Sequence, residues 1–309
     1  MLCLDVAQII CDYCDLRTQI NLISSCQEYY EYLKIRNLNA YDGIGSNITQ
    51  EILTQRKFDK LQKLYAEDNK KIIDVNHLQN SLTELYCSWK CGINQIGIAN
   101  LKVLQKLNAC DNNKITDVNH LRSTLIELTC SCNCGIDQKG ISNLRVLQKL
   151  HANNNNKITD VNHLRNTLTK LYCLGACEID QKGISNLKVL RKLNANYNKK
   201  ITDVNHLQNT LIELDCYWYC GIDQKGISEL KVLQKLNANG NDKITDVNHL
   251  QNTLIELDCR NNCGIDQKGI SNLNVLQKLI ADGNSKITDV TRYKTHYLNY
   301  IADMIAEYL

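Results

Sequence analysis

The sequence predicts an α/β solenoid, because one motif is repeated along almost the whole chain. The stretch from Leu125 to Thr167 recurs with small changes, and each copy begins 43 residues after the one before it. The other copies begin at Leu82, Leu168, Leu211 and Leu254. Each copy contains two shorter units that open with L-x-x-L-x-(C/A), here called the A unit (LIEL) and the B unit (LQKL). A fixed internal period of this kind indicates a repeat architecture.

The length of the units identifies the class of repeat. Their first leucines fall at residues 61, 82, 104, 125, 147, 168, 190, 211, 233, 254 and 276, in steps of 21 or 22 residues. Leucine-rich repeats are about 20–29 residues long. Positions 1, 4 and 6 of each unit are apolar and alternate with polar residues, which is typical of a strand with one buried face. We therefore expect a horseshoe or arc with a parallel sheet on its concave face.

Units of this length leave little room for full helices, so we expect short helical or 3-10 turns on the convex face. Residues 35–60 read as a degenerate first unit. The predicted organisation is a helical segment at 1–36, a solenoid of this degenerate unit and eleven regular ones at 37–290, and a capping helix at 291–309. A helix at each end would protect the exposed ends of the array.

Several repeated polar residues have predicted roles in the scaffold. Position 9 of every B unit is asparagine, which we expect to satisfy backbone groups buried where the chain turns. The I-T-D-V run supplies Asp117 and its equivalents as caps for a short helical turn at V-N-H-L. In the A units, glycines after D-Q-K are expected to permit a bend. These glycines are Gly140, Gly183, Gly226 and Gly269.

The composition excludes several classes of protein. The chain has 309 residues, of which 43% are hydrophobic, enough for a continuous core. A net charge of +3 gives no indication of nucleic-acid or membrane-surface binding. No run of 18 apolar residues is present, and Asp5 and Asp12 interrupt the start of the chain, which argues against a signal peptide. We expect a cytoplasmic or nuclear protein that is not secreted.

Ten of the sixteen cysteines recur as C-x-x-x-C pairs. The pairs are Cys87/Cys91, Cys130/Cys134, Cys173/Cys177, Cys216/Cys220 and Cys259/Cys263. Equivalent cysteines would lie about 9.6 Å apart, because strands are spaced about 4.8 Å and a B unit intervenes. This exceeds the roughly 7 Å reach of a disulfide, and the intervening alanines provide no zinc ligand. We expect buried apolar filler, with no metal or cofactor, although a disulfide within one pair remains open.

The first 36 residues differ from the repeats. Apolar residues at helical spacing predict three short helices, with Asp15 and Ser25 as candidate caps. The order is a leucine, an acid followed by an aliphatic residue, paired aliphatics, an Asp-Leu corner, and a cysteine followed by aromatics. The residues are Leu2, Asp5, Val6, Ile9, Ile10, Tyr13, Asp15, Leu16, Gln19, Ile20, Leu22, Ser25, Cys26, Tyr29 and Tyr30.

This order resembles the F-box, the helical motif that docks on the Skp-family adaptor of cullin-type ubiquitin ligases. Where that family has an early proline and a further leucine, this chain has Cys3 and Cys14. The resemblance implies an adaptor-binding apolar face made of Leu2, Leu4, Val6, Ile9, Ile10 and Leu16. The alternative is that the three helices only cap the end of the solenoid.

The repeats themselves resemble the cysteine-containing leucine-rich repeats of F-box proteins, in which an I-T-D element follows the strand. Such proteins occur among substrate receptors of cullin-type ligases and in repeat families of large DNA viruses. The resemblance implies a substrate-recognition subunit of an SCF-like ubiquitin ligase, with a target on the concave face. The alternative is a stand-alone binding scaffold with no ubiquitin role. We find no catalytic motif, so we do not expect an enzyme.

If the repeated positions build the scaffold, the target site should lie where the copies differ. Position 3 alternates between lysine and glutamate, which places opposite charges on neighbouring strands. Lys170 breaks this alternation, and aromatic and charged residues lie near it at positions 5, 7 and 8; such residues are typical of recognition hot spots. The predicted partner-binding residues are Lys149, His151, Lys170, Tyr172, Leu174, Lys192, Tyr197, Asp215, Tyr217, Trp218, Asp258 and Arg260. A second aromatic group, Tyr65, Tyr86 and Trp89, is expected to bind there or to pack against the N-terminal helices.

Overall fold

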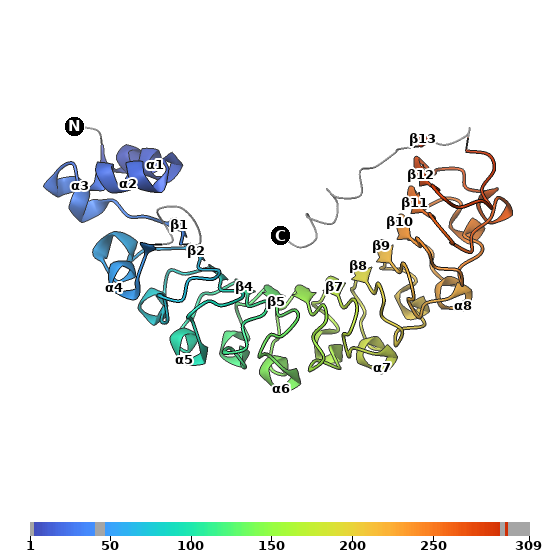
Figure 1. Cartoon of the computed structure of the whole chain (residues 1–309), viewed down its shortest axis with the longest axis horizontal. Coiled ribbons are helices and arrows are strands. Elements are labelled where there is room, and N and C mark those ends of the chain that lie inside the picture. Colours follow the sequence, from blue (N-terminus) through green and yellow to red (C-terminus); the bar gives the residue numbers. More distant parts are fainter. Residues whose placement is uncertain (1–2, 41–46, 291–293, 296–309) are drawn as a thin grey trace. The chain divides into compact units, whose positions relative to one another are not determined.

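The computed structural model of the chain describes residues 3–40, 47–290 and 294–295. The chain forms two compact bodies, Met1–Leu168 and Thr169–Leu309, which we call the N-terminal and C-terminal bodies. Within each body the strands stand side by side along one side and the short helices lie along the other (Figure 1). We call these the strand side and the helix side. Among the described residues, no helix has the length and apolar character needed to cross a membrane.

The strands of the N-terminal body form a parallel ladder in chain order. Each is three residues long, and each pairs in parallel with the next. They are β1 (Asn37–Asn39), β2 (Lys63–Tyr65), β3 (Glu84–Tyr86), β4 (Lys106–Asn108), β5 (Glu127–Thr129) and β6 (Lys149–His151). The register joins equivalent positions, so that Leu107 is opposite Leu128 and Lys106 is opposite Glu127.

The C-terminal body continues with the same pattern. Its strands also pair in parallel and in register. They are β7 (Lys170–Tyr172), β8 (Lys192–Asn194), β9 (Glu213–Asp215), β10 (Lys235–Asn237), β11 (Glu256–Asp258), β12 (Lys278–Ile280) and β13 (Lys294–Thr295). The predicted capping helix at 291–309 lies outside the described residues except at Lys294–Thr295, which are extended and not helical.

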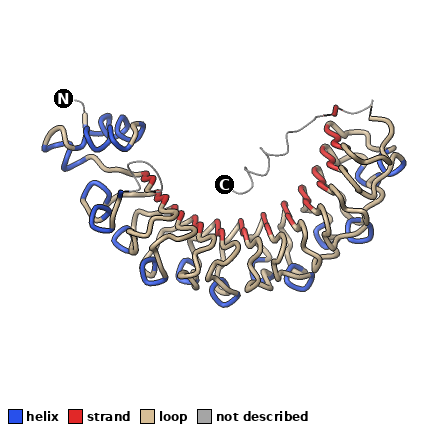
Figure 2. Tube along the Cα trace, viewed as in Figure 1, coloured by secondary structure: helices blue, strands red, loops and turns tan. Residues whose placement is uncertain are grey.

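The turns on the helix side are short, as the unit length predicted, and they alternate in type (Figure 2). The first four regular A units have a four-residue turn of α-helix, the fifth has a 3-10 turn, and the B units with described turns have a 3-10 turn. The A-unit turns are α5 (Gln95–Ile98), α6 (Gln138–Ile141), α7 (Gln181–Ile184), α8 (Gln224–Ile227) and the 3-10 turn η8 (Lys268–Ile270). The B-unit turns are η3 (Asn76–Leu78), η4 (Asn119–Leu121), η5 (Asn162–Leu164), η6 (Asn205–Leu207) and η7 (Asn248–Leu250). The degenerate unit has α4 (Gln50–Leu53) and η2 (Arg56–Phe58).

The core lies between the two sides and is built from the repeated apolar positions. In the B unit that begins at Leu147, the side chains of Leu147, Leu150 and Ala152 are fully buried. Burying one leucine side chain stabilises a fold by about 1.5–3 kcal/mol relative to leaving it exposed. The ten paired cysteines are buried in the same core and are free thiols, as expected for apolar filler.

The asparagine at position 9 of each B unit joins that unit to the preceding A unit. The Asn155 side-chain amide donates to the backbone carbonyls of Cys130 and Ile136, at 2.7 and 3.2 Å. Its oxygen accepts from the backbone N–H of Lys157 at 2.9 Å. Asn155 is fully buried, so these bonds supply backbone groups that water does not reach. The equivalent residues Asn69, Asn112, Asn198, Asn241 and Asn284 make the same contacts.

Two other predicted scaffold roles have different outcomes. Asp117 accepts a hydrogen bond from the backbone N–H of Asn119 at 2.7 Å and so supports the start of the 3-10 turn, although the N-cap residue of that turn is Val118. Gly140 does not form a bend, because it lies within α6. A Cβ atom at Gly140 would lie 2.1 Å from the backbone oxygen of Thr116. Glycine is therefore required there by the close approach of the preceding unit.

The repeated histidines lie on the helix side and bond to the backbone of the preceding unit. The Nε2 atom of His120 lies 3.0 Å from the carbonyl oxygen of Ile98, and His163 bonds in the same way to Ile141. Partial burial lowers the pKa of His120, which favours the neutral ring at neutral pH. These residues join neighbouring units and belong to the scaffold.

The predicted three N-terminal helices are present as α1 (Leu4–Tyr13), α2 (Leu16–Ile23) and α3 (Gln27–Tyr32). Asp15 caps α2 by accepting from the N–H of Thr18, whereas Ser25 is not a cap, because α3 is capped at Cys26. The Gln8 side chain exchanges two hydrogen bonds of 2.9 Å with the backbone of Lys34, which attaches α1 to the start of the solenoid.

Replacing Asn155 by alanine should destabilise the chain, because the carbonyls of Cys130 and Ile136 would be buried without a donor. A buried polar group left unpaired costs about 1–3 kcal/mol. We therefore expect Asn155→Ala to lower the free energy of unfolding, measured by urea titration with circular dichroism, by at least about 2 kcal/mol. The neighbouring Asn156 is exposed, so Asn156→Ala is the control and should change stability by no more than about 0.5 kcal/mol. Equal shifts in the two variants would contradict the proposed role of Asn155.

Candidate protein-binding surfaces

The strand side carries the predicted alternation of charge at position 3. In the N-terminal body Glu84 forms ion pairs with Lys63 at 3.1 Å and with Lys106 at 3.5 Å. In the C-terminal body Lys192 pairs with Glu213 at 3.2 Å and Lys235 pairs with Glu256 at 3.0 Å. Exposed pairs of this kind each stabilise a protein by about 0–1 kcal/mol. They nevertheless neutralise much of the charge on this side.

Three of the predicted partner-binding residues are lysines at position 3, and they have different surroundings. Lys149 lies in the N-terminal body and pairs with Glu127 at 2.7 Å. Lys170 and Lys192 are opposite each other in the register of β7 and β8, and Lys170 is exposed. The ammonium of Lys192 also lies over the ring of Tyr172, 5.6 Å from its centroid. Lys170 therefore interrupts the alternation of charge between β7 and β8.

Next to these strands, four aromatic side chains form a group that we call the aromatic cluster: Tyr197, Tyr217, Trp218 and Tyr219. The rings of Tyr197 and Tyr217 meet edge to face, with centroids 5.7 Å apart. Tyr219 lies 6.4 Å from both Tyr197 and Trp218, measured between ring centroids. Tyr197 and Tyr219 are 43% and 66% exposed, so two of the four rings present large apolar area to solvent.

The backbone under this cluster is strained. Position 8 of every regular unit has a positive φ: Asp68, Trp89, Asp111, Cys132, Asn154, Gly175, Tyr197, Trp218, Gly240, Asn261 and Gly283. Glycine, asparagine and aspartate adopt this conformation readily, whereas for other residues it costs about 1–2 kcal/mol of stability. Tyr197 and Trp218 are two of these other residues. Tyr219, at position 9, is also left-handed, so this unit departs from the regular backbone pattern at Tyr219.

Strain of this kind persists where the surrounding structure enforces it, and it is concentrated at functional sites. The indole of Trp218 packs on Gly240, where an added Cβ atom would lie 3.1 Å from the ring. Gly240 itself has a φ of +63°. The position of Trp218 thus depends on a glycine in the next unit.

Two buried amide groups lie in the same part of the strand side. Asn194 and Asn196 are fully buried, and their side-chain NH₂ groups have no partner among the described residues. Their oxygens are used: Asn196 Oδ1 accepts from the N–H of Tyr217 at 2.9 Å, and Asn194 Oδ1 accepts from the N–H of Asn196 at 3.2 Å. A buried donor without an acceptor costs about 1–3 kcal/mol.

The remaining predicted residues also lie on the strand side but differ in accessibility. Tyr172 and Asp215 end β7 and β9, and Leu174 follows β7; all three are half-buried. The Arg260 side chain folds back and forms an ion pair with Asp258, with Nη2 2.6 Å from the carboxylate. His151 ends β6 in the N-terminal body.

Tyr219 and Lys199 also belong to this surface, although neither was predicted from the sequence. The ammonium of Lys199 lies 5.6 Å from the centroid of the Tyr219 ring. Tyr219 is at position 9 of its A unit, where the other copies have Lys90, Asn133, Ala176 and Asn262. Comparison at position 9 would have revealed the aromatic residue. The left-handed backbone that brings it beside Trp218 could not be read from the sequence.

The second aromatic group has a self-contained structure in the N-terminal body. Tyr65 and Tyr86 stack with centroids 4.5 Å apart, and the ammonium of Lys63 lies within 5.3 Å of both ring centroids. The Tyr86 hydroxyl donates to Glu84 at 3.2 Å. Trp89 is 47% exposed. These residues are stabilised by one another and by the charge ladder.

A different exposed surface lies on α1. Val6, Ile9, Ile10 and Tyr13 are 44%, 57%, 42% and 89% exposed, and their spacing places them along neighbouring rows of the helix. We call these four residues the helix stripe. Of the other predicted adaptor-binding residues, Leu4 and Leu16 are half-buried, and Leu2 lies outside the described residues.

The comparison with solved structures decides the class of repeat. An internalin of Listeria monocytogenes is similar in structure, with a TM-score of 0.52 and 24% identity, over 88% of this chain and 82% of that one. The fold is a leucine-rich repeat. With the parallel strands, brief turns and eleven regular units already described, this confirms the fold class predicted from the period.

The chain of a Rad7 and Elc1 complex from yeast also matches, with 17% identity over 94% of this chain and 92% of that one. Its TM-score of 0.45 is too low to establish a common fold. No protein-family model matches the sequence, and no curated protein does.

Adding a methyl group at Gly240 should disturb Trp218 specifically. Gly240→Ala and Gly283→Ala both place a side chain at a positive φ, so each should destabilise the repeat by about 1–2 kcal/mol. At Gly283 the nearest atom to the new Cβ would be 3.4 Å away, which is an ordinary contact. In a Trp89→Phe background, where Trp218 is the remaining tryptophan, Gly240→Ala should shift the tryptophan fluorescence and Gly283→Ala should not. The same spectrum in both variants would show that Trp218 does not depend on Gly240.

Proposed function

We propose that this leucine-rich-repeat chain is the substrate-recognition subunit of an SCF-like ubiquitin ligase. The N-terminal helices bind a Skp-family adaptor that connects the chain to a cullin, and the strand side binds a target protein. The chain is a binding module, and the ubiquitin-transfer chemistry belongs to other subunits. Its free thiols suit a reducing compartment such as the cytoplasm or nucleus.

The observation that carries this proposal is the orientation of α1. A helix that only caps a solenoid buries its large apolar residues and exposes its polar ones. In α1 the buried residues are the small Ala7 and Cys11, whereas Val6, Ile9 and Ile10 are exposed. Fully burying one such aliphatic side chain contributes about 1.5–3 kcal/mol. The exposed stripe is therefore suited to a protein partner.

The attachment of α1 to the solenoid supports the same interpretation. Gln8 and Asp12, which hold α1 to Lys34 and Arg36 by hydrogen bonds and a 3.4 Å ion pair, lie on the part of the helix that faces the repeats. These contacts leave the helix stripe exposed on the opposite part of α1. An adaptor could bind there without displacing the first repeat unit.

For the target, the strand side of the C-terminal body offers the aromatic cluster. Rings of this kind supply large contact area at low entropic cost, and they are common in hot spots.

The adaptor part of the proposal is tested with purified proteins. The full chain should retain a Skp-family adaptor in a pull-down, and Ile9→Asp with Ile10→Asp should abolish retention, because two charges would be buried at the interface. The matched control is Ile73→Asp with Ile96→Asp, which changes two isoleucines of the repeat region that are 51% and 77% exposed. The control should bind like the wild type, and circular dichroism should show all chains folded.

If the unaltered, folded chain does not bind any Skp-family adaptor, the ligase role is wrong. The chain would then be a stand-alone binding scaffold. Binding that survives Ile9→Asp with Ile10→Asp would instead move the adaptor contact away from the helix stripe.

The target part of the proposal is tested separately in cells. A target protein that cross-links to the wild type should no longer cross-link to the Tyr217→Ala, Trp218→Ala double variant. Adaptor binding by this variant should be unchanged. The control is Tyr65→Ala with Trp89→Ala, which removes the same residue types from the N-terminal body. The stripe variant should show the opposite result, retaining the target and losing the adaptor. Unchanged cross-linking of the target to Tyr217→Ala with Trp218→Ala would exclude the aromatic cluster as the target site.

A further inference from the structure

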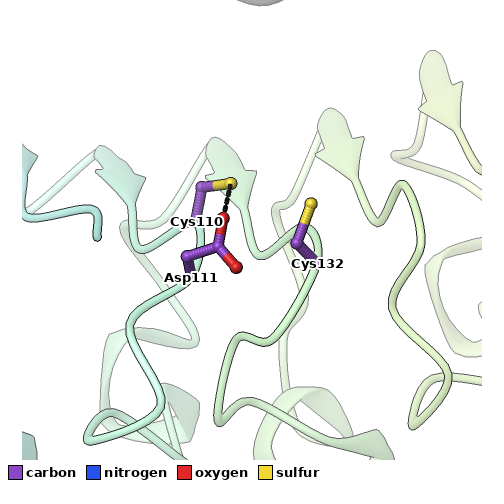
Figure 3. Close-up of side chains that lie close together, drawn as sticks. All are labelled: Cys110, Asp111 and Cys132. Carbon is purple, nitrogen blue, oxygen red and sulfur yellow. Dashed lines mark hydrogen bonds between the residues drawn. The ribbon is translucent and has the colours of Figure 1, made fainter. Parts of the chain in front are cut away.

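The remaining cysteines outside the repeated pairs include two that come together on the strand side. Cys110 follows β4 and Cys132 follows β5, at the carboxyl ends of neighbouring parallel strands. Both are half-buried, unlike the fully buried cysteines of the core. In Figure 3 a carboxylate oxygen of Asp111 points toward the Cys110 sulfur, and Cys132 lies on the loop of the neighbouring unit. All three residues belong to the N-terminal body.

The ligand atoms of these residues lie within the range of a shared metal ion. One sulfur or oxygen atom from each of Cys110, Asp111 and Cys132 lies within 4.8 Å of the other two. Cys110 Sγ is 3.7 Å from Asp111 Oδ2. Ligands of a tetrahedral zinc ion lie about 3.5–3.8 Å apart, given metal–ligand distances of about 2.0–2.3 Å. Side-chain rotations that move the ligand atoms by about 1 Å would bring them to the separations of a tetrahedral zinc site.

The backbone that presents these ligands is held in place by hydrogen bonds. The carbonyl of Cys110 accepts from the N–H of Trp89 at 2.8 Å, and the N–H of Cys132 donates to the carbonyl of Asn153 at 2.7 Å. The N–H of Asp111 donates to the carbonyl of Ser131 at 3.2 Å. Neighbouring units thus fix the positions of all three Cα atoms.

The carboxylate of Asp111 is also oriented. Its Oδ1 atom accepts from the backbone N–H of Asn133 at 3.2 Å, while Oδ2 is directed to Cys110. A hydrogen bond to the second oxygen of a ligating carboxylate is the usual outer-shell support in metal sites. One oxygen is therefore held by the scaffold and the other is available to a cation.

The backbone conformation of Cys132 is a further indication. It has a φ of +58°, at a position where most of the other units have glycine, asparagine or aspartate. A cysteine with this φ lowers the stability of the fold by about 1–2 kcal/mol. The Cys132 side chain is also only half-buried, so it does not fill the core. Such strain indicates a role for the side chain.

We propose that Cys110, Cys132 and Asp111 bind a zinc-type divalent cation. Two sulfur ligands select a thiophilic ion over magnesium or calcium, and the carboxylate completes a three-ligand set. Binding releases the two thiol protons to solvent, with two sulfur–metal bonds and one oxygen–metal bond formed and no change of oxidation state. The fourth position is filled by water or by a side chain of a bound partner.

The site joins β4 and β5 on the strand side, next to a surface cleft lined by Trp89, Lys90, Asp111 and Asn133. A metal ion there would cross-link two repeat units. Its open position would face molecules that bind in the cleft. The proposal is independent of the ubiquitin-ligase role.

The test uses the full chain, purified in reductant and stripped of metal, and titrated with Co²⁺ as a spectroscopic substitute for Zn²⁺. The wild type should bind one equivalent, with thiolate-to-cobalt charge-transfer absorption that added Zn²⁺ removes. Cys110→Ser and Cys132→Ser should each abolish the absorption. Asp111→Asn, which tolerates the positive φ, should weaken binding at least about tenfold. Cys26→Ser, a half-buried cysteine on the N-terminal helices, is the control and should bind like the wild type.

A second measurement needs no variant. Zn²⁺ should slow alkylation of Cys110 and Cys132 in the unaltered chain, detected by mass spectrometry, without protecting Cys14 or Cys26. The proposal is overturned by any of three results: no uptake of Co²⁺ or Zn²⁺, the same absorption in the Cys110→Ser and Cys132→Ser double variant, or a Cys110–Cys132 disulfide in metal-free protein prepared without oxidant.

Discussion

The asparagine at position 9 of the B units is the interaction on which the rest of the structure depends. After each B-unit strand the chain turns inward, and the carbonyls of the preceding A unit lose their partners in the ladder. Asn155 and its equivalents supply donors to two of these carbonyls and accept from the next turn. Because the contact joins positions in fixed register, it determines which residues of neighbouring units lie side by side. The charge ladder on the strand side follows from that register.

The same regularity imposes a constraint on the variable positions. Position 8 is left-handed in every regular unit, since the turn after the strand is identical from copy to copy. Glycine, asparagine or aspartate would meet this constraint at little cost. Trp89, Cys132, Tyr197 and Trp218 do not, and the last three each belong to a cluster on the strand side. The repeat is therefore locally destabilised at these positions, where side chains other than glycine, asparagine or aspartate are present.

The cysteines show why position within the repeat matters more than residue type. Those at positions 6 and 10 point into the core, where burial raises the pKa of Cys173 and keeps it as an inert thiol. Cys110 and Cys132 occupy positions 7 and 8, outside the core. Equivalent cysteines in successive A units are separated by an intervening strand, but these two belong to adjacent units and are brought together by the turn.

The sequence by itself determined the leucine-rich-repeat fold, the length of its turns, the register of opposite charges and the role of the position-9 asparagines. These follow from local periodicity, because a repeat unit can bury its apolar face only against its neighbours. It also placed three helices at the N-terminus and identified Tyr197, Tyr217 and Trp218 as exceptions. Their residue types are unlike those of the other copies, which a single chain reveals.

Only the tertiary structure decided how those exceptions meet. The outward orientation of Ile9 and Ile10, the folding of Arg260 onto Asp258, the addition of Tyr219 and the meeting of Cys110 with Asp111 and Cys132 depend on backbone conformation and on contacts between units. Gly140 was assigned a bend from its residue type, but its reason is the backbone of another unit. The contacts between units, such as that of Cys110 with Cys132, depend on the turn geometry, and no local pattern in the sequence specifies that geometry.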